Sequence, residues 1–86
     1  MLYPIEYQKS AAKEISKLDR YTAKRILNRL EWLSVNLDST KLFPLKADLA
    51  GFFKLREGSY RIIFEVRWAE RIIVVHKVAH RRDVYK

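Results

Sequence analysis

Residues 54–66 read Lys-Leu-Arg-Glu-Gly-Ser-Tyr-Arg-Ile-Ile-Phe-Glu-Val, and the alternation of side chains in this stretch decides the fold. Gly58 separates two alternating runs and suits the positive φ of a tight turn, so the pattern predicts antiparallel strands at 52–57 and 60–68. Successive side chains of a strand point to opposite faces. The predicted helix-facing residues are Phe53, Leu55, Tyr60, Ile62, Phe64, Val66 and Trp68. The predicted opposite face holds Lys54, Arg56, Arg61, Ile63 and Glu65.

A third strand is expected at 71–78, after a turn at Ala69-Glu70. Both of its alternating sets are largely apolar, so the sequence leaves open which set faces the core. One set is Ile73, Val75, Lys77, Ala79 and Arg81, and the other is Ile72, Val74, His76 and Val78, in which His76 is predicted to be structural. A further strand is expected at 3–7, where Pro4 should lie at the start or on a sheet edge because it has no N–H to donate.

Two helices are predicted between the first strand and the hairpin. In residues 9–18 and 21–36, apolar residues recur at the spacing of an amphipathic helix. Asp19 suits the N-cap of the second helix, and residues 38–51 are predicted to form a loop. The predicted fold class is α+β with the order β-α-α-β-β-β, in which a two-helix hairpin packs on one face of a mostly antiparallel four-stranded sheet. One domain should span residues 1–86.

Size and composition restrict the classes of function. The chain has 86 residues, a net charge of +8 and no cysteine, which excludes disulfides and thiolate metal sites. No apolar run approaches the roughly 20 residues of a membrane span, and the N-terminal residues lack the layout of a signal peptide, so a cytoplasmic location is expected. The positive charge favours a polyanionic partner, namely nucleic acid, an anionic membrane surface or an acidic protein, unless it serves solubility alone.

The charged face of the predicted sheet narrows this choice. Lysine and arginine side chains project from neighbouring strands onto one surface, which suits phosphate groups and indicates RNA rather than a metabolite. These cations are Lys54, Arg56, Arg61, Lys77 and Arg81. No cofactor or metal is expected, because two histidines without a nearby carboxylate pair are a weak metal motif.

Most of the chain resembles the RelE/ParE toxin superfamily, and its RelE branch in particular. The stretches that carry the resemblance are residues 9–18, 45–51, 53–66 and 80–85. The resemblance implies a metal-independent toxin that enters the ribosomal A site and cuts mRNA, with the RNA's own 2′-hydroxyl as nucleophile and a cyclic phosphate as product. The alternatives are a ParE-like inhibitor of DNA gyrase and a non-toxic homologue that only binds its antitoxin.

The resemblance also implies a set of partners. A cognate antitoxin, acidic or amphipathic, would cover the basic sheet face or displace the C-terminal segment. The ribosome and the translated mRNA would be the targets, and no membrane is involved. The toxin–antitoxin complex would bind operator DNA through the antitoxin.

Two arginines are the predicted catalytic cations. Attack by a 2′-hydroxyl builds negative charge on the phosphorane oxygens, and guanidinium groups suit this charge because they stay ionised and bind two oxygens at once. Arg61 and Arg81 are the candidates, and the family pattern also places arginines at both positions. The alternatives are an Arg61 that pairs with Glu65 on a solvated face and an Arg81 that is only a chain-end charge.

Proton transfer requires a base for the 2′-hydroxyl and an acid for the departing 5′-oxygen. Lys54 matches a basic position of the family, but Phe52 stands where the family has a second lysine. This departure favours His80 as the residue that transfers the proton. The alternative is that His80 has a surface or structural role. Because His80 and Arg81 are adjacent, both reach one site only if the strand ends near Val78.

Tyr85 is a third candidate for proton transfer, and its role relative to Lys54 and His80 is left open. It matches the family's C-terminal tyrosine, which could orient the 2′-hydroxyl or stack on an mRNA base. The alternative is a terminal aromatic side chain that folds back on the core. Predicted RNA contacts that position the substrate are Lys46, Arg56, Lys77 and Arg82.

Overall fold

The computed structural model describes residues 2–85, so the two terminal positions of the predicted domain lie outside it. Within this range the chain forms a single five-stranded sheet with the strand order β1-β5-β4-β3-β2. Its elements are β1 (Ile5–Tyr7), α1 (Lys9–Ser16), α2 (Arg20–Asn36), the short 3₁₀ helix η1 (Leu37–Ser39), β2 (Phe43–Pro44), the second 3₁₀ helix η2 (Ala47–Leu49), β3 (Phe53–Glu57), β4 (Tyr60–Arg67) and β5 (Ile72–His80).

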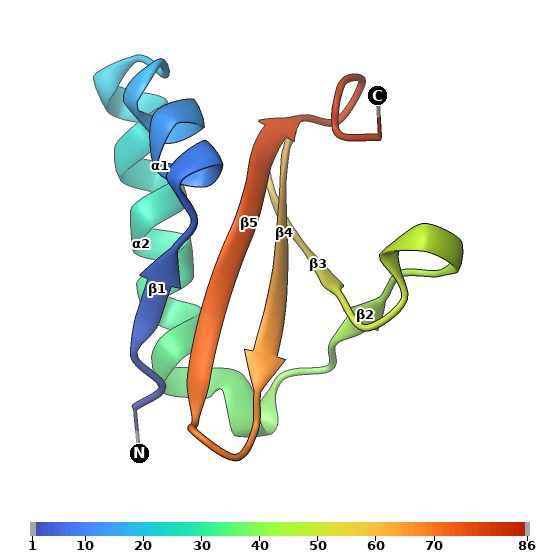
Figure 1. Cartoon of the computed structure of the whole chain (residues 1–86). Coiled ribbons are helices and arrows are strands. Elements are labelled where there is room, and N and C mark those ends of the chain that lie inside the picture. Colours follow the sequence, from blue (N-terminus) through green and yellow to red (C-terminus); the bar gives the residue numbers. More distant parts are fainter. Residues whose placement is uncertain (1, 86) are drawn as a thin grey trace.

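The two helices lie together on one side of the sheet, as Figure 1 shows. β1 runs parallel to β5, and the other neighbouring strands are antiparallel. The α+β class and the helical hairpin are therefore confirmed. The predicted count of four strands is short by one, because β2 lies in the predicted loop and pairs through Phe43 with Lys54 and through Pro44 with Phe53. A two-residue strand is too short to show a period in sequence.

Helix α2 begins where the sequence indicates. The Asp19 carboxylate accepts a hydrogen bond from the Thr22 backbone N–H at 3.0 Å, which satisfies one of the free donors of the first turn. The predicted N-cap is therefore confirmed. Hydrogen bonding from Thr22, through its side chain first and its backbone second, lowers the pKa of Asp19. Among residues 2–85, no helix combines the length and apolarity needed to cross a bilayer.

The core lies between the helix hairpin and the sheet. Buried α2 residues meet the helix-facing residues of β4 and β5, and Phe64 is the largest side chain in this set with no exposed surface. Trp68 is an exception to the predicted pattern, because it is 55% exposed. It follows the end of β4 at Arg67, so strand alternation no longer determines its direction. The core residues without exposed surface include Ile26, Leu30, Leu33, Ile62, Phe64, Ile73 and Val75.

A β-bulge in β5 lets residues of both alternating sets reach the core. Ile63 pairs with Lys77 whereas the next residue, Phe64, pairs with Val75, so His76 is the extra residue of the ladder. Because the bulge changes the alternation, Val75 before it and Val78 after it both belong to the core. The bulge thereby leaves His76 and Lys77 on the other face, where both line a cleft.

Replacing the glycine of the β3–β4 turn is expected to destabilise the protein. Gly58 has φ +58, and a Cβ added there would lie 3.0 Å from Nη2 of Arg25, which binds Glu57 at 2.6 Å. We expect Gly58→Ala to lower the free energy of unfolding by about 1 kcal/mol, because the new side chain is strained at positive φ. Urea denaturation measures this difference.

Gly51→Ala is the matched control. Gly51 also has a positive φ, of +95, but no atom lies within 4 Å of its added Cβ. Its loss is therefore a backbone term alone, and this term should be larger than that at Gly58, because φ +95 lies outside the left-handed α region that φ +58 occupies. A Gly58→Ala variant as stable as the original chain would contradict the role assigned to this turn.

Candidate functional site

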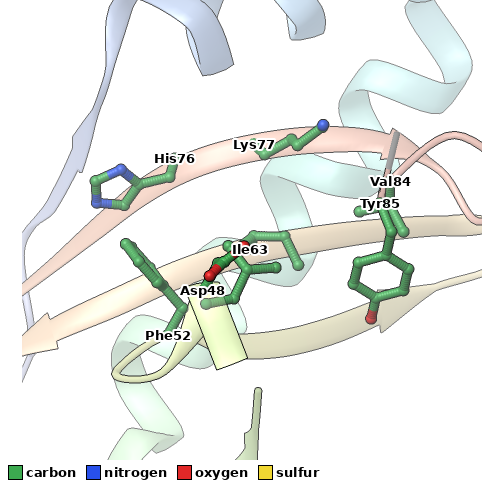
Figure 2. Close-up of a pocket in the computed structure, with 8 residues that line it drawn as sticks. Asp48, Phe52, Ile63, His76, Lys77, Val84 and Tyr85 are labelled. Carbon is green, nitrogen blue, oxygen red and sulfur yellow. The ribbon is translucent and has the colours of Figure 1, made fainter. Parts of the chain in front are cut away.

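The sheet face away from the helices carries a cleft of about 460 Å³. Residues from η2, β4, β5 and the turn that follows β5 surround it, and Figure 2 shows their side chains. Val84 is buried and anchors the C-terminal turn, whereas Tyr85 is 59% exposed at the same cleft. The alternative in which Tyr85 folds back on the core is therefore wrong. The lining residues are Asp48, Leu49, Phe52, Ile63, His76, Lys77, Val84 and Tyr85.

Arg61 is held beside the β3–β4 turn. Its side chain is only 8% exposed, and Nη1 donates to the carbonyl oxygens of Gly58 at 3.0 Å and Tyr60 at 2.8 Å. Both bonds use Nη1, so Nε and Nη2 take no part in them. Arg61 therefore does not depend on Glu65 as its partner. Arg61 precedes Ile63 by two positions on β4, which places it on the same face, next to the cleft.

Arg81 is attached to the same turn through its backbone. Its N–H donates to the carbonyl oxygen of Ser59 at 2.7 Å, and its side chain is exposed. The Arg61 side chain binds the carbonyl of Gly58, the residue before Ser59. Arg61 and Arg81, the two predicted catalytic cations, are thus fixed at one turn although 20 positions separate them in the sequence.

His80 lies apart from the cleft. β5 continues to His80, so the predicted end of the strand near Val78 is wrong. The cause is continued pairing, since His80 lies opposite Tyr60 in the ladder. The two rings meet edge to face at 5.6 Å, Tyr60 packs on the helix-side core, and Nδ1 of His80 accepts from the Arg82 N–H at 3.3 Å. His80 is therefore not among the cleft-lining residues.

The remaining predicted site residues lie in different places. Lys77, a predicted RNA contact, lines the cleft. Lys54, a candidate for proton transfer, and Arg56, a predicted RNA contact, instead line a separate groove of about 120 Å³ beside β2. Lys46 is exposed at the start of η2, and Arg82 is exposed in the C-terminal turn.

His76 at the cleft wall has a charged partner that the sequence did not predict for it. Oε1 of Glu65 accepts hydrogen bonds from His76 Nε2 at 3.2 Å and from Arg67, through Nη2 at 3.2 Å and Nε at 3.3 Å. The hydrogen bond from His76 is the main reason that the pKa of Glu65 is lowered, and Arg67 adds to it. The signal in the sequence was His76-Lys77, two successive polar residues that interrupt the apolar strand and mark the bulge.

Comparison with known proteins identifies the family. The model of the ParE toxin of type II toxin–antitoxin systems matches residues 5–85, and the chain belongs to this family. The candidate toxin RelE1 of Methanocaldococcus jannaschii is 28% identical over 89 residues, which cover 100% of this chain and 98% of that protein. The toxin RelG of Mycobacterium tuberculosis is 37% identical over 43 residues, which cover 50% of this chain and 49% of RelG.

Solved structures agree with this assignment. A chain of the RelBE2 toxin–antitoxin complex of M. tuberculosis has a TM-score of 0.85 at 25% identity, over 96% of this chain and 95% of that chain. The archaeal RelE–RelB complex of Pyrococcus horikoshii contains a chain with a TM-score of 0.75 at 22% identity, over 98% and 100% of the two chains. The predicted membership of the RelE/ParE superfamily is confirmed, and this protein is a RelE-like toxin of a toxin–antitoxin system.

Proposed function

We propose that this toxin is an endonuclease that cuts translated mRNA in the ribosomal A site. The observation that carries the proposal is the open face of the sheet, where Arg61 and Arg81 are fixed at one turn next to a cleft lined by Lys77 and Tyr85. Cations at such a surface bind phosphates, and an exposed aromatic side chain beside them offers a stacking platform for a base. This combination suits single-stranded RNA better than a small metabolite.

The two arginines would act on the transition state. Attack of the 2′-hydroxyl on the neighbouring phosphate places extra negative charge on the phosphorane oxygens, which preorganised guanidinium groups stabilise. Arg61 is already oriented by two backbone carbonyls, so little rearrangement is needed. Arg81 is exposed and can close on the phosphate when RNA binds.

The remaining cations would position the message. Tyr85 would stack on a base, and Lys77 would contact a phosphate within the cleft. Other cations would bind the RNA backbone without taking part in the chemistry. Lys46, Arg56 and Arg82 are exposed, and the partly buried Lys54 lies with Arg56 in the separate groove beside β2.

The toxin would be controlled by a cognate antitoxin. The solved relatives from M. tuberculosis and P. horikoshii are toxin–antitoxin complexes, which supports a similar arrangement here. With a net charge of +8, this chain favours an acidic or amphipathic antitoxin that covers the open face. The antitoxin of the complex would also make any contact with operator DNA.

Primer extension on an mRNA under translation in a cell-free system tests the nuclease. We expect new 5′ ends at A-site codons when the purified protein is added, because the ribosome presents the message to the open face. The same message with translation blocked is the control and should stay intact. An uncut message on active ribosomes would contradict the proposal.

Inhibition of DNA gyrase is the second candidate function. The matching family model is that of ParE, and Phe52 occupies a position where a lysine is expected for the nuclease. A gyrase supercoiling assay with the same protein preparation separates the two functions. Inhibited supercoiling together with an uncut message would favour the gyrase reading, and inactivity in both assays would favour a homologue that only binds its antitoxin.

A further inference from the structure

His76 lies at the wall of the cleft and is hydrogen-bonded to Glu65 of β4, and neither residue has a role in the function described so far. We propose that His76 is the general base of the cleft and that Glu65 is its positioning residue. The inference rests on the proposed nuclease function, because the proton to be removed is that of the RNA 2′-hydroxyl. Histidine suits this task because it accepts and releases protons near neutral pH.

The hydrogen bonds determine which ring nitrogen can act. His76 Nε2 lies 3.2 Å from Oε1 of Glu65, which also accepts from Arg67 at 3.2 Å. These contacts lower the pKa of Glu65, so its carboxylate stays ionised and can only accept hydrogen bonds. Nε2 must therefore carry a hydrogen, and Nδ1 of the neutral ring is left with the lone pair that takes a proton.

One contact packs against the His76 ring, and another binds the His76 backbone. Phe52 contacts it edge to face, with ring centroids 4.8 Å apart and planes at 80°. The backbone carbonyl of His76 accepts from the Ser10 hydroxyl of α1 at 3.3 Å. Phe52 stands where a basic side chain was expected, and it cannot transfer a proton. The His76 ring, which contacts Phe52, can do so.

Several charged groups surround this pair and set its electrostatics. Glu65 and Arg67 face the ring from β4, and Asp48 of η2 and the neighbouring Lys77 share the cleft with it. On β1, Glu6 pairs with Val74, two positions before His76. Glu65 is the charged side chain in hydrogen-bond contact with the ring. Removing its charge should therefore have the largest effect on the protonation of the ring.

His76 would act on the attacking hydroxyl, and water would protonate the leaving oxygen. Nδ1 of His76 takes the proton of the 2′-hydroxyl while the 2′-oxygen forms its bond to phosphorus. The bond from phosphorus to the 5′-oxygen breaks, and this oxygen takes a proton from water. The imidazolium gives its proton to the hydroxide so formed, which restores the enzyme and leaves a 2′,3′-cyclic phosphate and a 5′-hydroxyl.

The pH dependence of single-turnover cleavage on programmed ribosomes tests the assignment. His76→Gln keeps a donor for Glu65 but cannot accept the proton, so we expect cleavage to slow by about 100-fold or more. The rise in rate with pH that a histidine base imposes should disappear in this variant. Glu65→Gln should slow cleavage less and move that rise to lower pH, since the negative charge that stabilises the protonated ring is lost.

His80→Gln is the matched comparison, because it changes the other histidine of the chain, which lies outside the cleft. It should keep both the rate and the pH-dependent rise, and thermal unfolding should show all three variants folded. A His76→Gln variant that is slow but keeps the original pH dependence would indicate a purely structural ring and overturn the inference. A His76→Gln variant that cleaves as fast as the original chain would also overturn the inference. If the original chain itself leaves the message uncut, the proposed nuclease function is overturned as well.

Discussion

Replacing Arg81 with alanine is expected to slow cleavage of the translated message by about 100-fold to 1000-fold while the protein stays folded. The guanidinium of Arg81 is exposed, and its backbone N–H, which binds Ser59 at 2.7 Å, is retained in alanine. The loss should therefore concern the charged transition state and not the fold. Cleavage rates at saturating toxin, together with circular dichroism, measure both properties.

Two further variants sharpen this experiment. Arg20→Ala removes an equal charge from the start of α2, on the helix side of the sheet, and should leave the rate close to that of the original chain. Arg81→Lys keeps the charge but loses the two-pronged geometry, so its rate should lie between those of the arginine and alanine forms. Full activity of a folded Arg81→Ala variant would remove this residue from the proposed chemistry.

Phe64→Ala is expected to reduce the free energy of unfolding by about 3–5 kcal/mol. Phe64 has no exposed surface, and its ring packs on Phe53 at 5.7 Å between centroids. Alanine would leave a cavity at the centre of the sheet. Because a chain of this length is stabilised by only about 4–13 kcal/mol in total, much of its stability would be lost.

Phe43→Ala is the control for Phe64→Ala, because it deletes the same atoms from a side chain that is 55% exposed. It should change the free energy of unfolding by about 0.5 kcal/mol or less. Chemical denaturation of both variants gives the comparison. Equal losses for the two phenylalanines would contradict the location of the core.

The features that sequence predicted depend on neighbouring residues. The Gly58 turn and the Asp19 cap are local, and each is present as expected. Two features that were missed, strand β2 and the bulge in β5, depend on pairing between strands. The bulge at His76 follows from how β5 aligns with β4, and alternation within β5 alone does not contain this information.

The candidate site was predicted in part for the same reason. Arg61 and Arg81 were selected by motif, and the structure shows both at one turn. His80 was expected beside Arg81, but continued pairing with Tyr60 directs it to the helix side. The contact between Glu65 and His76 joins two strands across the bulge, so strand periodicity assigned His76 a structural role.

The parallel pairing of β1 with β5 has a consequence for synthesis of the toxin. Ile5 pairs with Ile73, so contacts that complete the sheet join segments almost 70 positions apart. Contacts between segments so far apart in the sequence slow folding, because the long connection must be closed before they can form. During translation, β1 therefore waits at the ribosome exit for β5, and the cleft cannot assemble until residues 81–85 have emerged. A nascent chain held short of that point would lack the cleft.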